Sequence, residues 1–156
     1  MKIKDLMTQH VISVDPKLPI PEAQKRMKEG GFRRLPVLEK GELIGIITDR
    51  DIREAMPSDA TSLSIWEINY LIPKILVKEI MTKNPVTVSQ DASVERAARL
   101  MLEHKVGGLP VMSGGSLVGM ITVTDVLWAF LELSGNNAVV GENEASTRGM
   151  VASRRA

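Results

Sequence analysis

Along this chain, segments in which hydrophobic residues have helical spacing alternate with short strand-like runs. The same succession of segments occurs twice. Residues 94–102 place apolar side chains at the three- and four-residue intervals of an amphipathic helix, and Ser93 stands at the N-cap position. An earlier stretch has the same spacing, with Pro21 in its first turn and Gly30-Gly31 at its end. The pattern therefore predicts one amphipathic helix in each half of the chain.

Short β-type runs surround each of these helices. We expect a brief strand before each one, at Val11–Val14 and at Val86–Val88. After them, apolar runs flank small, glycine-bearing connections in residues 35–47 and 109–121, which is typical of tight hairpins. A second helix is expected after each hairpin, so the predicted order is β-α-β-β-α, occurring twice.

The two halves form an internal repeat. Residues 7–51 and 81–125 align at a constant offset of 74 with no gap, and 15 of the 45 paired positions are identical. Two copies are too few for a solenoid, so we expect a pseudo-symmetric pair.

This pattern divides the chain into four segments. We assign one motif to residues 1–56, a connector with a short helix to 57–76, the second motif to 77–133, and a weakly packed tail to 134–156. In the connector, Ser64 and Glu67 have capping-box spacing, and Pro73 ends the helix that they begin. Apolar residues on one face of that helix predict that the connector is packed rather than flexible.

The composition and charge of the chain exclude several classes of protein. The 156 residues are 44% hydrophobic and 25% charged, and no apolar run approaches the roughly 20 residues of a membrane-spanning helix. The net charge of +1 creates no field that would attract nucleic acid or an anionic membrane. Because cysteine is absent, disulfides and thiol catalysis are excluded. We find no export signal and expect a cytoplasmic protein.

The repeated motifs resemble those of a known family. Met-Thr begins each copy, Leu-Pro-Val stands in the middle, and Gly45–Asp51 (GIITDRD) is matched by Gly119–Asp125 (GMITVTD). On these motifs, each copy resembles a CBS (cystathionine-β-synthase-type) motif and the whole resembles a CBS pair, or Bateman module. The connector over residues 62–71 is similar to that of acetoin-utilisation-type CBS proteins. The resemblance implies an α+β fold in which two tandem β-α-β-β-α CBS motifs pack as a pseudo-twofold pair.

The resemblance also implies a function. CBS pairs are regulatory modules that bind adenosine-containing ligands in clefts between the two motifs, and they form homodimers. AMP, ADP or ATP is the expected ligand here, with S-adenosylmethionine or NAD as alternatives, and no cofactor is required. The regulated effector would be a separate protein. A second hypothesis is a dimerisation scaffold whose ligand sites are vestigial.

An enzyme is not expected. The two histidines, His10 and His104, do not correspond in the repeat, and no metal-ligand pattern, P-loop or dinucleotide fingerprint is present.

Thr48 and Asp51, with their counterparts Thr122 and Asp125, mark the predicted change from strand to helix. Their spacing is that of a capping box, which by itself would explain both pairs. The same position also suits a ligand, because free N–H groups at a helix start attract phosphate and a carboxylate accepts hydrogen bonds from ribose hydroxyls. The repeat context favours capping together with ligand binding.

Positive charge distinguishes the two copies. Arg33, Arg34 and Arg50 belong to the first copy, where the second has two glycines and a threonine, so the first should favour the more phosphorylated ligand. The family places the adenine near the Leu-Pro segment, whose prolines we expect at strand starts, and uses hydroxyls of the first strands. These implied ligand residues are Leu35, Pro36, Leu109, Pro110, Ser13 and Thr87.

The last helix, within residues 125–133, carries apolar side chains around most of its circumference, which exceeds the stripe that one core requires. We expect it to form the homodimer interface; the alternative is that the connector helix around Trp66 or the tail covers it. The predicted interface residues are Val126, Leu127, Trp128, Phe130 and Leu131.

Overall fold

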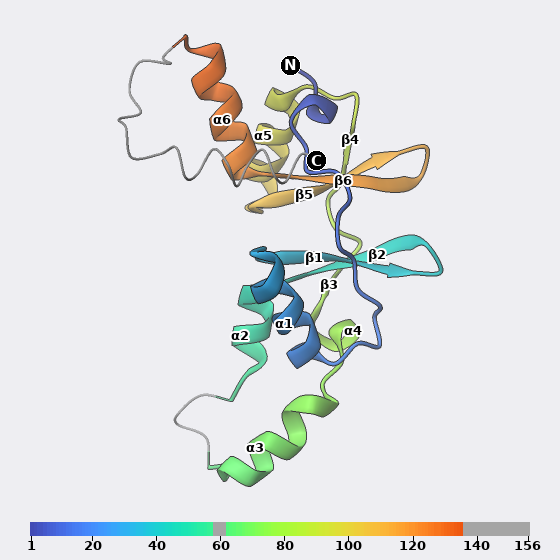
Figure 1. The fold of residues 1–156 in the computed structure, drawn as a ribbon, viewed down its shortest axis with the longest axis vertical. Helices are drawn as coiled ribbons and strands as arrows, with labels where there is room; N and C mark the ends of the chain where they lie inside the picture. The colour runs from blue at the N-terminus through green and yellow to red at the C-terminus, as the bar shows by residue number, and fades with distance from the viewer. Residues whose placement is uncertain (58–61, 136–156) are drawn as a thin grey trace. The chain divides into compact units, whose positions relative to one another are not determined.

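The computed structural model describes residues 1–57 and 62–135, which form two compact units (Figure 1). The repeat-1 unit comprises Ile12–Pro85, and the repeat-2 unit comprises Met1–Val11 together with residues 86–135. Each unit has its own cluster of buried aliphatic residues and its own three-stranded sheet.

The repeat-1 unit contains a helix, a hairpin and a second helix, followed by the connector and a short arm. Its elements are α1 (Ile20–Gly30), β1 (Arg34–Glu39), β2 (Glu42–Thr48), α2 (Asp49–Ala55), α3 (Ile65–Leu71), η2 (Ile72–Lys74), α4 (Val77–Ile80) and β3 (Thr82–Lys83). Gly31 ends α1 in the left-handed conformation, as predicted from the Gly30-Gly31 pair.

The repeat-2 unit has the same layout. Its elements are η1 (Ile3–Asp5), β4 (Val88–Ser89), α5 (Val94–His104), β5 (Gly108–Ser113), β6 (Ser116–Thr122) and α6 (Val123–Leu133). The Ser93 hydroxyl accepts a hydrogen bond from the Arg96 N–H and so caps α5, which confirms the predicted helix start. The α+β class and the repeated helix–hairpin–helix order are therefore observed.

Each unit is completed by the segment that precedes the other repeat. We call residues 1–11 the N-terminal arm and residues 75–85 the internal arm. Ile3 of the N-terminal arm is fully buried in the repeat-2 core, and its N–H donates to the Ala92 carbonyl at 3.0 Å. Val77 of the internal arm is fully buried in the repeat-1 core, and its N–H donates to the Leu18 carbonyl at 2.8 Å. The compact units therefore cross the boundaries of the repeats.

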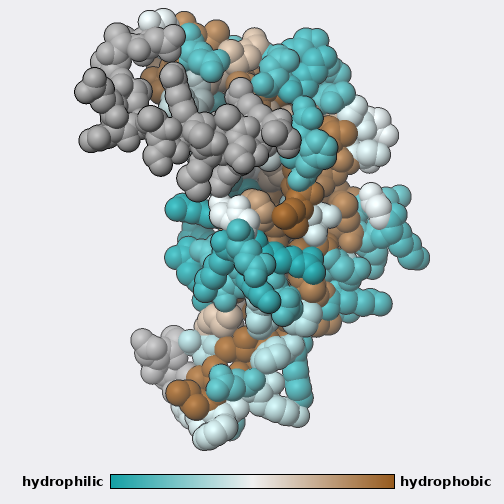
Figure 2. All heavy atoms as spheres, viewed as in Figure 1, coloured by the Kyte–Doolittle hydropathy of each residue, from teal (hydrophilic) through white to brown (hydrophobic). Residues whose placement is uncertain are grey.

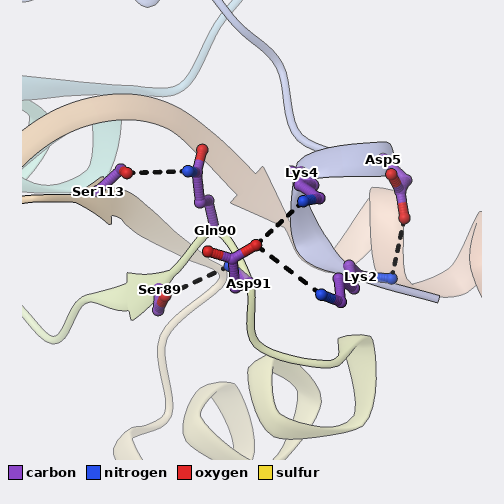
Figure 3. Close-up of polar contacts among 7 residues, drawn as sticks. All are labelled: Lys2, Lys4, Asp5, Ser89, Gln90, Asp91 and Ser113. Atoms are coloured by element: carbon purple, nitrogen blue, oxygen red, sulfur yellow. Dashed lines mark hydrogen bonds and ion pairs between the residues drawn. The ribbon is translucent and has the colours of Figure 1, made fainter.

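Polar contacts also hold the N-terminal arm to the repeat-2 unit. Lys4 Nζ lies 3.1 Å from Asp91 Oδ1, in the loop before α5, and Lys2 Nζ lies 3.9 Å from the same oxygen (Figure 3). These ion pairs are exposed and contribute little to stability, about 0–1 kcal/mol each, so the arm is held mainly by its buried apolar residues.

Both sheets contain an antiparallel hairpin with a short strand on one side and an isolated bridge on the other. The arm supplies one neighbour: β3 pairs with β2, and Thr8 of the N-terminal arm forms a bridge with Met120 of β6. The first strand of each repeat supplies the other, but it is shorter than predicted. Only Val14 of Val11–Val14 forms a bridge, and the second strand begins at Val88 rather than Val86.

Pro36 and Pro110 lie at the third position of their strands, so the expectation of strand starts was wrong. In the repeat-1 unit, Val14 donates to the Pro36 carbonyl at 2.9 Å and accepts from the Leu38 N–H at 3.0 Å. This pairing requires no N–H at residue 36, so a proline is tolerated inside the strand.

The connector helix α3 also differs from the expectation. The Ser64–Glu67 capping box forms as predicted, but α3 has no buried residue, and Trp66 is 82% exposed. Its apolar residues therefore lie at the surface, at the lower end of Figure 2. None of the helices in the described part of the chain combines the length and apolarity needed to cross a membrane.

Candidate functional site

A threonine–aspartate pair stands between strand and helix in both units, as the sequence predicted. In the repeat-1 unit, Asp51 Oδ2 accepts hydrogen bonds from the Thr48 N–H and the Thr48 hydroxyl, both at 2.8 Å. In the repeat-2 unit, Asp125 Oδ2 accepts from the Thr122 N–H at 2.7 Å and from its hydroxyl at 2.8 Å. The same two bonds to Oδ2 are therefore formed in both units, and in the repeat-1 unit the Asp51 N–H also donates to the Thr48 hydroxyl at 3.2 Å.

Capping uses only one oxygen of each carboxylate. Asp51 and Asp125 are half-buried, and within the described residues neither Oδ1 atom has a hydrogen-bond partner. An ionised carboxylate oxygen can accept up to two hydrogen bonds, and it is an acceptor only. Each pair can therefore accept hydrogen bonds from a ligand hydroxyl without giving up its cap.

The hairpin register brings the start of one strand beside each pair. Arg34 lies opposite Thr48, and the Arg33 carbonyl accepts from the Asp49 N–H at 2.8 Å. The second unit repeats this arrangement: Gly108 lies opposite Thr122, and the Gly107 carbonyl accepts from the Val123 N–H at 3.1 Å. The predicted site residues at the ends of each hairpin are thus neighbours within their unit.

The Leu-Pro residues follow directly along the same strands. Leu35, Pro36, Leu109 and Pro110 are all buried, with side chains among the least exposed of the described residues. None of these four predicted ligand residues therefore presents an exposed side chain in this structure.

Ser13 and Thr87 each stand one residue before the strand that pairs in parallel with the hairpin. Ser13 is half-buried and Thr87 is exposed. Neither hydroxyl makes a hydrogen bond among the described residues, so both keep their donor and acceptor capacity.

Arg50 lies in a pattern of charges that the sequence analysis did not use. Its Nε donates to Glu54 Oε1 at 2.9 Å, and Arg53 Nε lies 3.2 Å from Asp49 Oδ2. Both are exposed i,i+4 pairs on α2, and this spacing could have been recognised from sequence. Arg50 is therefore held in part by its own helix.

Two further observations concern a cavity and the possible metal ligands. A cavity of about 400 Å³ in the repeat-1 unit is lined by Ile12, Arg26, Glu29 and Gly30, and none of these is a predicted ligand residue. Across residues 1–57 and 62–135, no group of three or more acidic, histidine or cysteine residues could hold a metal ion.

Comparison with known protein families shows to which family this chain belongs. The model of the CBS domain matches residues 3–58 and again residues 77–132. The chain belongs to the CBS-domain family. The two matches contain both Thr–Asp pairs, so each CBS domain carries one.

Solved CBS structures have the same fold. The CBS domain pair of protein MJ0100, in complex with 5-methylthioadenosine and S-adenosyl-L-methionine, is 27% identical, with a TM-score of 0.71 over 85% of this chain and 98% of that one. CBSX2 from Arabidopsis thaliana, in complex with AMP, is 30% identical, with a TM-score of 0.71 over 85% and 98%. AcuB from Vibrio cholerae, named for acetoin utilization, is 26% identical, with a TM-score of 0.70 over 86% and 93%.

Some curated relatives are much longer than this chain. It is 33% identical to an inosine-5'-monophosphate dehydrogenase of Korarchaeum cryptofilum over 128 residues, which are 81% of this chain and 24% of the dehydrogenase. Another relative is matched over 46% of its length. CBS domains therefore occur both within enzymes and, as in the MJ0100 structure, as a pair.

Proposed function

We propose that this CBS pair is a non-catalytic regulatory module that binds an adenosine-containing ligand, with AMP, ADP or ATP favoured. The observation that carries the proposal is the Thr–Asp pair, in which the threonine N–H and hydroxyl donate to Oδ2 in both units, with the other carboxylate oxygen left without a partner among the described residues.

The chemistry of the pair fits a ribose. Its 2′ and 3′ hydroxyls are donors, and each Oδ1 is an acceptor held in place by the capping bonds on Oδ2. AMP, 5-methylthioadenosine and S-adenosyl-L-methionine, which share adenosine, are bound in the CBSX2 and MJ0100 structures, and this supports the same ligand class here.

A ligand panel tests the proposal directly. We expect AMP, ADP or ATP to raise the melting temperature, and a ligand present at 100 times its dissociation constant stabilises by about 2.7 kcal/mol. S-adenosylmethionine and NAD belong in the panel as alternatives. If no adenosine-containing ligand binds, the proposal fails and the scaffold alternative with vestigial sites is favoured.

Substitution of the aspartates separates ligand binding from capping. In Asp51→Asn and Asp125→Asn, the amide oxygen can still accept the capping bonds, while an NH₂ group replaces the acceptor that the ribose would use. Losing a hydrogen bond to a charged group costs about 1.5–3 kcal/mol, so each variant should weaken one site by roughly 10- to 100-fold. Unchanged affinity by calorimetry in both single variants and in the double variant would refute the role of the aspartates.

We further propose that the chain forms a homodimer through α6. Val123, Leu127, Phe130 and Leu131 recur at intervals of three and four residues and are all exposed, with Phe130 at 64%. Of the other two predicted interface residues, Val126 packs against the repeat-2 core and Trp128 is half-buried. A continuous apolar helix face in water favours association.

A further inference from the structure

A methionine of each arm lies over a glycine of the neighbouring hairpin. Met7 of the N-terminal arm and Met81 of the internal arm are equivalent positions of the repeat. A Cβ atom built on Gly45 would lie 2.5 Å from Met81 Sδ, and one built on Gly119 would lie 2.6 Å from the sulfur of the other methionine. Each sulfur therefore occupies the space that a side chain at the glycine position would need.

The internal arm has few contacts with β2 near this methionine. The two-residue strand β3 pairs with Gly45 and Ile46, and both of its residues are exposed. The apolar contacts of the arm come from residues before β3: Val77 is fully buried, and Met81 packs against the repeat-1 core. Met81 is thus the apolar contact that directly precedes the short strand.

The two equivalent methionines differ in their access to solvent. Met7 is buried, with 7% of its surface exposed, whereas Met81 is half-buried. An oxidant in solution can therefore approach Met81 in the folded chain, but it approaches Met7 only when the N-terminal arm opens. The repeat places one accessible and one protected thioether at matched positions.

The reaction that this arrangement allows is the oxidation of a thioether by a peroxide. A lone pair of Met81 Sδ attacks one oxygen of hydrogen peroxide, so that a sulfur–oxygen bond forms and the oxygen–oxygen bond breaks. The proton of the transferred oxygen passes to the departing hydroxide, which leaves as water. The sulfur loses two electrons to the peroxide, and the product is a polar methionine sulfoxide.

A sulfoxide does not suit the place that Met81 occupies. Gly45 has no side chain that could bind the new oxygen, and its strand is fixed by pairing with Val37 on one side and Lys83 on the other. Withdrawing a polar oxygen from water without a hydrogen bond is costly. Because the end of a methionine side chain is flexible, the oxidised group moves into solvent and its apolar contact is lost.

We propose that Met81 is an oxidation site that controls how firmly the internal arm is held. A peroxide converts it to the sulfoxide, and the arm then loosens from β2, while the N-terminal arm stays in place. The buried Val77 keeps the rest of the internal arm anchored, so the change is local. Since β2 ends at Thr48, the loosened strand is the one that leads into the first Thr–Asp pair.

The test is treatment of the whole chain with hydrogen peroxide, followed by peptide mass spectrometry and hydrogen exchange. We expect Met81 to be oxidised at least about fivefold faster than Met7. In the oxidised protein, exchange should rise at least about tenfold at residues 42–48 and 82–84 and stay within about twofold at residues 116–122, the matched strand.

The variant Met81→Leu identifies the sulfur responsible. Leucine keeps an apolar side chain of similar volume and cannot be oxidised. The control is needed because Met1 is exposed and Met56 and Met112 are half-buried, so the peroxide has access to them too. We expect peroxide to leave exchange at residues 42–48 unchanged in Met81→Leu and to raise it in the matched variant Met7→Leu as in wild type.

Enzymatic reversal gives a second measurement that needs no variant. Methionine sulfoxide reductases for both sulfoxide epimers, supplied with a dithiol as reductant, should return Met81 to the thioether and restore protection at residues 42–48. Exchange that stays raised after Met81 has been reduced would overturn the proposal. Three other results would also do so: equal oxidation rates of Met7 and Met81, unchanged exchange in protein fully oxidised at Met81, and a full response in Met81→Leu.

Discussion

At residues 45 and 119, an arm passes so close to the hairpin that a side chain has no room. A Cβ atom on Gly119 would lie 2.6 Å from Met7 Sδ and 2.8 Å from the Thr8 carbonyl oxygen. On Gly45 it would lie 2.5 Å from Met81 Sδ and 3.0 Å from the Thr82 carbonyl oxygen. A methionine end can move, whereas a backbone carbonyl held in a bridge cannot move without cost.

We therefore predict that Gly119→Ala destabilises the chain by about 1–3 kcal/mol, as overpacking does, and that Gly45→Ala costs less. The order follows from the closer backbone oxygen at Gly119. Denaturant unfolding measures both values, and Thr124→Ala, an exposed change in the same unit, should stay within about 0.5 kcal/mol. A larger loss for Gly45→Ala than for Gly119→Ala would contradict this.

Glu67 provides a residue-scale prediction of pH dependence. Hydrogen bonds from the Ser64 hydroxyl and the Ser64 N–H hold the pKa of the Glu67 carboxyl below its ordinary value of 4.5. The capping contribution is thus present above pH 4.5 and is lost as the pH falls through the lowered pKa. An NMR titration should show the low pKa in wild type and a value nearer 4.5 in Ser64→Ala. Equal pKa values in both proteins would show that Ser64 is not the cause.

The sequence predicted the local features of the residues well. The caps at Ser64, Ser93 and the two Thr–Asp pairs form between residues three apart, so their spacing alone contains the information. The burial of Leu35 and the tolerance of Pro36 inside a strand depend on neighbours distant in sequence, so spacing could not show them.

At the scale of elements, the arms are the feature that sequence analysis missed. The repeat continues upstream of Met7, since Ile3 and Leu6 correspond to Val77 and Ile80 at the same offset of 74. That correspondence marks the arms as equivalent, but it does not say which core each one enters. This depends on contacts between distant segments, such as Ile3 with Ala92.

The arms lead to a prediction of which unit each arm stabilises. Ile3→Ala removes a fully buried side chain and should cost about 2–5 kcal/mol. Although Ile3 precedes repeat 1, hydrogen exchange should rise in residues 94–121 and stay unchanged in residues 20–48. Val77→Ala is the matched variant and should give the opposite pattern. A loss of protection in residues 20–48 of Ile3→Ala would show that the N-terminal arm does not belong to the repeat-2 unit.

At the scale of the whole molecule, exposed apolar surface is the dominant feature. Leu127 and Phe130 on α6 are 57% and 64% exposed, while the connector helix exposes Ile65 and Trp66. The sequence indicated the α6 surface from its composition, but it did not distinguish Val126, which packs inward, from Leu127, which does not.

We predict that Leu127→Glu/Phe130→Glu converts a dimer of twice 17.1 kDa into a folded monomer, because the charges would be buried in the proposed interface. Light scattering measures the mass, and circular dichroism checks the fold. Trp66→Glu is the control, since it adds a charge to exposed apolar surface outside α6, and it should remain dimeric. A wild type that is monomeric at high micromolar concentration would refute the dimer.

The exchange of arms has a consequence for how such a chain can arise and be divided. In a chain with a single repeat, the core would lack the arm that here precedes the other copy, and a second chain could supply it. Fusion of two such chains would turn a concentration-dependent assembly into a unimolecular one. Accordingly, residues 12–74 expressed alone should lack the buried contact of Val77, and adding a peptide of residues 75–85 should restore protection to that core.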